Sequence, residues 1–230
     1  MKIKYLLILS VIILLVFLIY LTTIDKKIYY LSLGDYMAVG LTNENENKGY
    51  SELLKKYLIK NNLLEIYIND YSNKSYRTTD LIKDIQANKI VKIKSKNKTL
   101  KNALIKADII TLAIGNNDIK DKLTYSNSDE LYKYSDEMLE DLEKLFKLIR
   151  EYCKEDIYFI GLYNPYSSDF DKLFNYINKS SKELCEKYDI IYIDTYNLFS
   201  NNEILIDTYP TNSGYKEIFD ILKRQINKKN

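Results

Sequence analysis

Four short polar segments carry the side chains of this chain that could do chemistry. They are Gly34-Asp35-Tyr36, Asp70 to Thr78, Gly115 to Asp118, and Asp207 to Pro210. The first three follow short apolar runs that predict buried strands, and the last stands just ahead of a helical pattern. Because ligands of an open parallel sheet bind beyond the carboxyl ends of its strands, we expect the four segments to converge on one rim.

The absence of histidine from the sequence narrows the chemistry available at that rim. Histidine is the usual general base for a serine or cysteine nucleophile and the commonest metal ligand. Any mechanism that needs an imidazole from this chain is therefore excluded, and we expect neither a metal nor another cofactor. Cys153 and Cys185 lack the spacing of a zinc or redox motif, so we expect two buried or half-buried thiols, with a disulfide left open.

The amino-acid sequences of these segments resemble the conserved blocks of the SGNH/GDSL hydrolases and occur in the same order. Leu33 to Gly40 (LGDYMAVG) resembles the first block, G-D-S-x-x-x-G, with Tyr36 at the serine position. Ile114 to Asp118 (IGNND) matches the third block, G-x-N-D, and Tyr209 to Tyr215 (YPTNSGY) resembles the closing H-P-N-x-x-G-Y, with tyrosine for histidine. Ser72 to Leu81 is similar to the second block. The resemblance covers nearly everything after the N-terminal segment.

The resemblance implies ester hydrolysis, in which a serine attacks a carbonyl, a histidine takes its proton and an aspartate orients the histidine. In this sequence Tyr36 and Tyr209 occupy the first two positions, and Asp207 stands one position too close to Tyr209 for the common pattern of the acid. Backbone N–H groups of the nucleophile and second block and the third-block asparagine would hold the oxyanion. Matching positions for the oxyanion donors and the pocket frame are Tyr36, Ser75, Asn117, Gly34, Asp35, Gly115 and Asp118.

Tyrosine is a poor substitute for serine in this chemistry. A phenol has an ordinary pKa near 10, so about one molecule in a thousand is ionised at pH 7. Lys74 and Arg77 are the nearest candidates to activate it, and Tyr36 is bulky enough to fill the space of an ester carbonyl. We therefore favour a pseudoenzyme that keeps its rim for a cell-wall glycan, acyl or peptide ligand. The alternative is an active ester hydrolase on acyl or acetylated glycan substrates that uses Tyr36, Asp35 or Asp207.

The N-terminal segment predicts a membrane anchor. Tyr5 to Thr22 carries no charge and would span about 27 Å as a helix, enough for a bilayer core. The following residues lack a small-x-small cleavage site, so we expect residues 1–24 to be an uncleaved, single-pass signal anchor and 25–230 to be one SGNH hydrolase-like domain. Lysines flank the segment on both sides, so the expected extracytoplasmic placement at the cell membrane rests partly on the family resemblance.

Continuous apolar runs alternate with amphipathic helical patterns along the rest of the chain, which is typical of a parallel sheet covered on both faces. The runs are Ile28 to Leu33, Leu64 to Ile68, Ile109 to Ile114, Ile157 to Leu162 and Ile190 to Ile193. The helical patterns are Ser51 to Ile59, Thr79 to Gln86, Leu131 to Tyr152, Phe170 to Tyr188 and Ser213 to Ile226. They predict a three-layer α/β/α sandwich with a five-stranded parallel sheet, flavodoxin-like, as in the SGNH hydrolases.

Two polar stretches fall outside this scheme. Asn43 to Lys48 predicts a solvated loop, and Lys89 to Lys101, with six lysines, predicts a solvated edge or connection. Contact of the second stretch with an anionic membrane or wall polymer is the less favoured alternative. The net charge of +2 gives no electrostatic case for nucleic acid. An unrelated flavodoxin-like module is disfavoured by the ordered blocks and by the lack of a phosphate-binding glycine loop.

Overall fold

The computed structural model describes residues 5, 12–13, 27–42, 49–120, 122–123, 127–200, 205–206 and 208–229. Most of the predicted anchor, the predicted loop at 43–48 and Asp207 lie outside these ranges. Among the described residues, no helix is both long enough and apolar enough to cross a membrane.

A five-stranded sheet forms the centre of the molecule, with strand order β2-β1-β5-β6-β7 and every neighbouring pair parallel. Its strands are β1 (Ile28–Gly34), β2 (Leu64–Ile68), β5 (Ile109–Ala113), β6 (Asp156–Ile160) and β7 (Ile191–Ile193). Every residue of β5 is buried, as expected for a strand covered on both faces. The predicted five-stranded parallel sheet is therefore confirmed.

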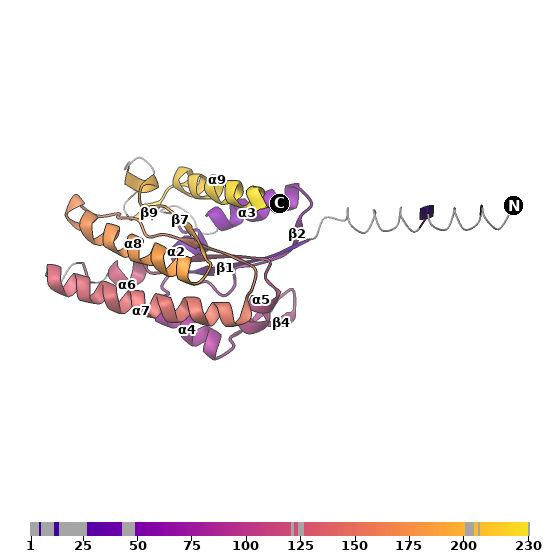
Figure 1. Ribbon diagram of the computed structural model, residues 1–230, viewed down its shortest axis with the longest axis horizontal. Helices are drawn as coiled ribbons and strands as arrows, with labels where there is room; N and C mark the ends of the chain where they lie inside the picture. The colour runs from indigo at the N-terminus through magenta and orange to yellow at the C-terminus, as the bar shows by residue number, and fades with distance from the viewer. Residues whose placement is uncertain are drawn as a thin grey trace.

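Helices cover both faces of the sheet (Figure 1). One layer contains α3 (Tyr50–Lys60) and α9 (Asn212–Lys229), which pack against each other. The other contains α4 (Thr78–Gln86), α5 (Leu100–Lys106), α7 (Ser128–Tyr152) and α8 (Asp171–Lys187). Successive residues of β1 alternate between the two layers, so Tyr30 joins the α3/α9 core and Leu31 the opposite one. Cys153 and Cys185 are buried, free thiols in this second core.

The lysine-rich segment, predicted to be a solvated edge or connection, contains regular secondary structure. It folds as an antiparallel hairpin of β3 (Ile90–Ile93) and β4 (Lys96–Thr99), and α5 follows directly. The turn residues Lys94 and Ser95 both have positive φ, 46° and 64°, which is the geometry of a two-residue hairpin turn. Such turns usually contain glycine or asparagine, so Lys-Ser gave no signal in the sequence. Val91 and Ile93 point inward and pack against the core.

The short elements complete the chain. They are α2 (Tyr36–Val39), α6 (Asn116–Lys120), the 3-10 helices η1 (Ser168–Phe170) and η2 (Leu198–Ser200), and the two-residue strands β8 (Leu205–Ile206) and β9 (Tyr209–Pro210). The first two begin directly after the carboxyl ends of β1 and β5, and β9 precedes α9. The sheet therefore brings the segments that carry chemistry to one edge.

Candidate functional site

The turn from β1 into α2 fixes the position of Tyr36. Gly34 has a φ of +135°, and a Cβ on it would lie 1.7 Å from the carbonyl oxygen of Ala113 on the neighbouring strand. Only glycine allows this close approach. Asp35 then caps the helix, since its Oδ1 accepts a hydrogen bond from the Met37 N–H at 2.9 Å. Tyr36 is thus the first residue of a helix at the carboxyl end of the sheet.

The Tyr36 side chain is buried, with 6% of its surface exposed. Its hydroxyl lies 3.0 Å from the Tyr163 hydroxyl, which donates to the Thr208 carbonyl at 2.7 Å. Tyr36 must therefore be the donor in the first contact. Its ring meets that of Tyr209 edge-on, with centroids 5.3 Å apart. Burial raises the pKa of Tyr36 well above its ordinary value, with the nearby tyrosines and Asp35 adding to the effect.

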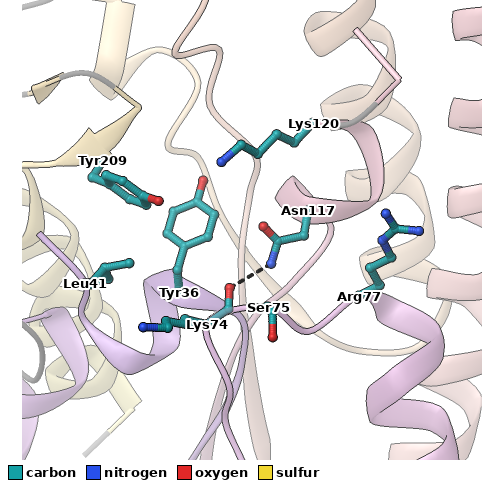
Figure 2. Close-up of a pocket in the computed structure, with 8 residues that line it drawn as sticks. All are labelled: Tyr36, Leu41, Lys74, Ser75, Arg77, Asn117, Lys120 and Tyr209. Atoms are coloured by element: carbon teal, nitrogen blue, oxygen red, sulfur yellow. Dashed lines mark hydrogen bonds between the residues drawn. The ribbon is translucent and has the colours of Figure 1, made fainter. Parts of the chain in front are cut away.

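An open cavity of about 400 Å³ lies beside this tyrosine pair (Figure 2). Its lining residues are Tyr36, Leu41, Lys74, Ser75, Arg77, Asn117, Lys120 and Tyr209. The structure thus brings together four of the residues singled out in the sequence and the two cations suggested near them. Three residues of the site were not predicted from the sequence. They are Leu41 and Lys120, which line the cavity, and Tyr163, whose hydroxyl contacts that of Tyr36. Tyr163 lies just beyond the predicted fourth strand, so the strand-end rule used for the other segments could have found it.

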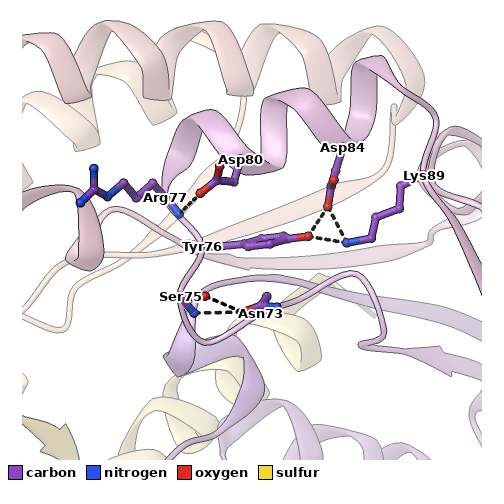
Figure 3. A network of polar contacts seen from close by, with 7 residues as sticks. All are labelled: Asn73, Ser75, Tyr76, Arg77, Asp80, Asp84 and Lys89. Carbon is purple, nitrogen blue, oxygen red and sulfur yellow. Dashed lines mark hydrogen bonds and ion pairs between the residues drawn. The ribbon is translucent and has the colours of Figure 1, made fainter.

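The predicted oxyanion donors Asn117 and Ser75 have partners within the protein. The Asn117 side-chain amide donates to the carbonyl oxygens of Lys74 and Tyr76, both at 2.9 Å (Figure 2). The Ser75 N–H and hydroxyl both donate to the Asn73 side-chain oxygen, at 3.0 and 2.9 Å (Figure 3). In this arrangement both groups are engaged within the protein and hold the loop after β2 in place.

A second set of polar contacts fixes the other side of that loop (Figure 3). The Tyr76 hydroxyl and the Lys89 ammonium both donate to Asp84, the ammonium at 2.8 Å, and Lys89 also donates to the Tyr76 hydroxyl. The N–H of Arg77, the residue that precedes α4, donates to the Asp80 carboxylate at 3.0 Å and so caps the start of this helix. The loop that carries the second sequence block is therefore held at several points, and the cavity wall that it forms is built into the fold.

The two acidic residues of the predicted frame, Asp35 and Asp118, are set back from the cavity and do not line it. Asp118 accepts hydrogen bonds from the Thr78 N–H at 3.1 Å and the Thr78 hydroxyl at 3.2 Å. Burial raises the pKa of Asp118 to about 6, against the lowering effect of Thr78 and Arg77. Asp35 is fully buried, and burial raises its pKa to about 7, against the Met37 N–H. Gly115, with φ +116°, turns the chain between β5 and α6.

No group of three or more potential metal ligands occurs within the described part of the chain. Asp207, the candidate acid, falls outside that part, whereas its neighbours Thr208 and Tyr209 are placed beside Tyr163 and Tyr36.

Comparison with known proteins identifies the family. Residues 30–222 match the GDSL-like lipase/acylhydrolase domain. The chain belongs to this family. No curated protein matches the sequence. Among solved structures, the lipase Lip_vut3 from a goat rumen metagenome superposes with a TM-score of 0.70 at 21% identity, over 85% of this chain and 95% of that one.

Two other solved structures share the fold of this GDSL-like domain. The acetylxylan esterase Axe2 from Geobacillus stearothermophilus gives a TM-score of 0.65 at 17% identity, over 88% of this chain and 95% of its own. The α/β hydrolase LAE5 from the metagenome of Lake Arreo, Spain, gives 0.60 at 16% identity, over 84% and 92%. Structures of Axe2 with its serine or its histidine changed to alanine are described as catalytic mutants of that esterase. At such low identities the likeness establishes the fold alone.

Proposed function

We propose that this GDSL-like domain is a pseudoenzyme, which has lost ester hydrolysis and keeps a ligand-binding pocket. The observation that carries the proposal is the state of Tyr36 at the position of the family's serine. Its ring is buried, and its hydroxyl donates a hydrogen bond to the Tyr163 hydroxyl. A nucleophile would instead donate this hydrogen bond to a general base. A nucleophile needs a base or a lowered pKa, and burial raises the pKa of Tyr36 instead.

The surroundings of Tyr36 support the same conclusion. The chain has no histidine to accept a proton, and Tyr209 packs its ring against Tyr36 at the position of the family's histidine. Stabilising an oxyanion requires donors already aimed at it. The Asn117 amide and the Ser75 N–H are engaged with the loop after β2, so using them would require breaking three hydrogen bonds.

A pocket of about 400 Å³ remains and is the basis for the binding half of the proposal. Its volume falls in the range of pockets that take small organic ligands. The structural neighbours are named as lipases and esterases, one of them acting on acetylxylan, which favours an acyl or glycan ligand. We further propose that residues 1–24 anchor the domain formed by 25–230 to the cell membrane, with the pocket on the extracytoplasmic side and a cell-wall glycan within reach. The uncharged run from Tyr5 to Thr22 supports this placement.

Ester turnover by the purified full-length chain tests the proposal. The substrates are p-nitrophenyl acetate and butyrate together with acetylated xylan, assayed from pH 6 to 9. We expect rates equal to those of an inactive control preparation. The rival hypothesis is a hydrolase that uses Asp35 as base, and the pKa of about 7 for that carboxyl is the observation in its favour. Turnover that is abolished by both Asp35→Asn and Asn117→Ala would establish that rival and end the pseudoenzyme proposal.

A further inference from the structure

We infer that the amino edge of the domain, where the strands of the sheet begin, rests on the surface of an anionic bilayer, with the β3–β4 hairpin as the main contact. This inference rests on the proposed function, because it assumes the anchor formed by residues 1–24. It follows from the place where the chain enters the domain, from the charge of the hairpin and from the exposed apolar side chains at the same edge.

The chain enters the domain at the amino edge. Lys27 precedes β1, and the first residue of this strand, Ile28, donates its N–H at 2.7 Å to the carbonyl of Leu63, just before β2. Only residues 23–27 separate this strand from the uncharged run that ends at Thr22. Five residues of extended chain span about 18 Å at most. An anchor that ends at Thr22 therefore keeps the amino edge within about 18 Å of the bilayer surface.

The β3–β4 hairpin lies at the same edge. After β2, α4 runs back from the carboxyl ends of the strands, and the chain then forms the hairpin and α5 before β5 begins at Ile109. The Asp108 N–H donates to the Tyr29 carbonyl at 2.9 Å, which ties the end of this segment to the start of β1. Figure 1 shows α5 and β4 at the end of the molecule from which β1 starts. A bilayer that meets the start of β1 therefore also meets the hairpin.

The segment that contains the hairpin is strongly basic. Residues 85–107 include seven lysines and no aspartate or glutamate. The acids at its two ends have partners, since Asp84 pairs with Lys89 and Asp108 accepts a backbone N–H of β1. Residues 23–27 add one net positive charge, and the whole chain carries only +2. A lysine near an anionic leaflet strengthens binding about fivefold, so this local excess of charge favours an anionic lipid surface.

Three of these lysines are exposed at the tip of the hairpin. Lys92 is exposed between Val91 and Ile93, which are half-buried and pack against the core. Lys94 lies in the turn, and Lys96 begins β4. Because the inward side chains hold the hairpin against the core, the exposed lysines are carried on a fixed element of the fold.

Exposed aliphatic side chains gather at the same edge. Within the described part of the domain, the large apolar side chains that are exposed are Ile59, Ile90, Ile105, Tyr132 and Tyr176. The two tyrosines contact each other on α7 and α8. The isoleucines are 55–60% exposed, and they lie in the last turn of α3, at the start of β3 and in the last turn of α5. Since α3 and α5 belong to opposite layers, a flat bilayer against the amino edge meets both, and the apolar area adds to the attraction of the lysines.

This placement directs the pocket beside Tyr36 away from the bilayer. Tyr36 follows the carboxyl end of β1, and the seven residues of this strand span about 23 Å. A ligand therefore enters the pocket from the side that faces away from the membrane. This favours a glycan over an acyl chain that is embedded in the bilayer.

Quenching of a fluorophore by spin-labelled lipid headgroups tests this inference on the full-length chain. The fluorophore is attached through Asn97→Cys, an exposed position that pairs with Lys92 across the hairpin. The vesicles contain phosphatidylcholine alone or mixed with an equal part of phosphatidylglycerol. We expect strong quenching in the mixed vesicles and little in phosphatidylcholine alone. The combined changes Lys92→Gln, Lys94→Gln and Lys96→Gln should weaken the contact about a hundredfold and abolish the quenching.

Two matched controls accompany this measurement. Ser168→Cys places the same fluorophore at an exposed position on η1, beyond the carboxyl end of β6, and it should not be quenched. Changing three exposed lysines of α8 to glutamine removes the same charge elsewhere and should leave the quenching at position 97 unchanged; they are Lys172, Lys179 and Lys182. The two natural cysteines are buried, and the wild type carried through the same labelling gives their background.

The absence of quenching at position 97 would overturn the inference, and equal quenching at positions 97 and 168 would overturn the orientation. Equal quenching in the two kinds of vesicle would overturn the role of anionic lipid. Loss of quenching on addition of soluble poly(glycerol phosphate) would show that the hairpin prefers an anionic polymer to the bilayer.

The proposed function fails by different results. Release of the chain from the vesicles by alkaline extraction would contradict the anchor, and the quenching measured before extraction would still decide whether the hairpin meets anionic lipid. Ester turnover would contradict the pseudoenzyme proposal and would not affect the quenching.

Discussion

Replacing Asp35 with asparagine should stabilise the protein at neutral and alkaline pH. Asp35 is fully buried at the start of α2, where its Oδ1 accepts the Met37 N–H. Asparagine keeps this oxygen and is an equally good helix cap. The substitution therefore removes the charge of the carboxylate and preserves the one hydrogen bond that the helix needs.

The size of the effect follows from the pKa of this carboxyl. Burial raises it from the ordinary 3.8 to about 7, which means that the folded state holds the proton more tightly than the unfolded state. The contribution of Asp35 to the free energy of unfolding is therefore highest below about pH 4 and falls as the pH rises through about 7. A pKa difference of about 3 corresponds to about 4 kcal/mol. Asparagine does not titrate, so Asp35→Asn should match the wild type near pH 4 and exceed it by up to about 4 kcal/mol at pH 8.

Urea unfolding of both proteins at intervals from pH 4 to 8 measures this difference. The chain has no tryptophan, so far-ultraviolet circular dichroism is the suitable signal. Asp118→Asn should show the same trend with a smaller amplitude, because the pKa of Asp118 is raised only to about 6. A constant difference for Asp35→Asn, or one that decreases with pH, would refute the reasoning.

Three further substitutions test the contacts around the site. Asn117→Ala removes both hydrogen bonds to the loop carbonyls. It should lower the free energy of unfolding by about 1–2 kcal/mol and speed amide hydrogen exchange in the loop after β2. Unchanged exchange would contradict the role of Asn117 in holding this loop. Tyr36→Phe removes one neutral hydrogen bond and leaves Tyr163 bonded to the Thr208 carbonyl. The free energy of unfolding in urea should therefore fall by about 0.5–1.5 kcal/mol. A decrease above about 3 kcal/mol would mean that the hydroxyl has another role. Gly34→Ala forces its Cβ to 1.7 Å from the Ala113 oxygen, so it should destabilise by about 4 kcal/mol or prevent folding; a normal melting temperature would show that the turn is more adaptable.

Much of the fold was predictable because its signals are local. Five apolar runs became the five strands of one sheet, and the predicted helices α3, α4, α7, α8 and α9 lie within a few residues of their expected ends. The β3–β4 hairpin and α5 were missed, since the lysines of the hairpin resemble a solvated segment and the turn has no glycine. Tertiary packing of Val91 and Ile93 decides this hairpin, and a single sequence does not reveal that packing.

The residues that line the site were largely predictable from the sequence, whereas the hydrogen bonds that they make were not. Strand ends and sequence blocks gave Tyr36, Ser75, Asn117 and Tyr209, which line one cavity. The sequence did not reveal that Asn117 donates to two backbone carbonyls, because those carbonyls lie about forty residues away and the loop conformation sets their direction. Lys120 was overlooked for a related reason, since only the path of α6 turns its side chain over the tyrosine pair.

The ratio of ester hydrolysis rates between the wild type and Tyr36→Phe tests the central claim most directly. Traces of a host esterase would add the same rate to both preparations, so any difference between the two rates reports the contribution of the Tyr36 hydroxyl. With p-nitrophenyl acetate at pH 8, the pseudoenzyme account predicts a ratio of one, with neither protein above the control preparation. A wild-type rate that is many times that of Tyr36→Phe would show that this buried phenol still acts in catalysis and would contradict the account.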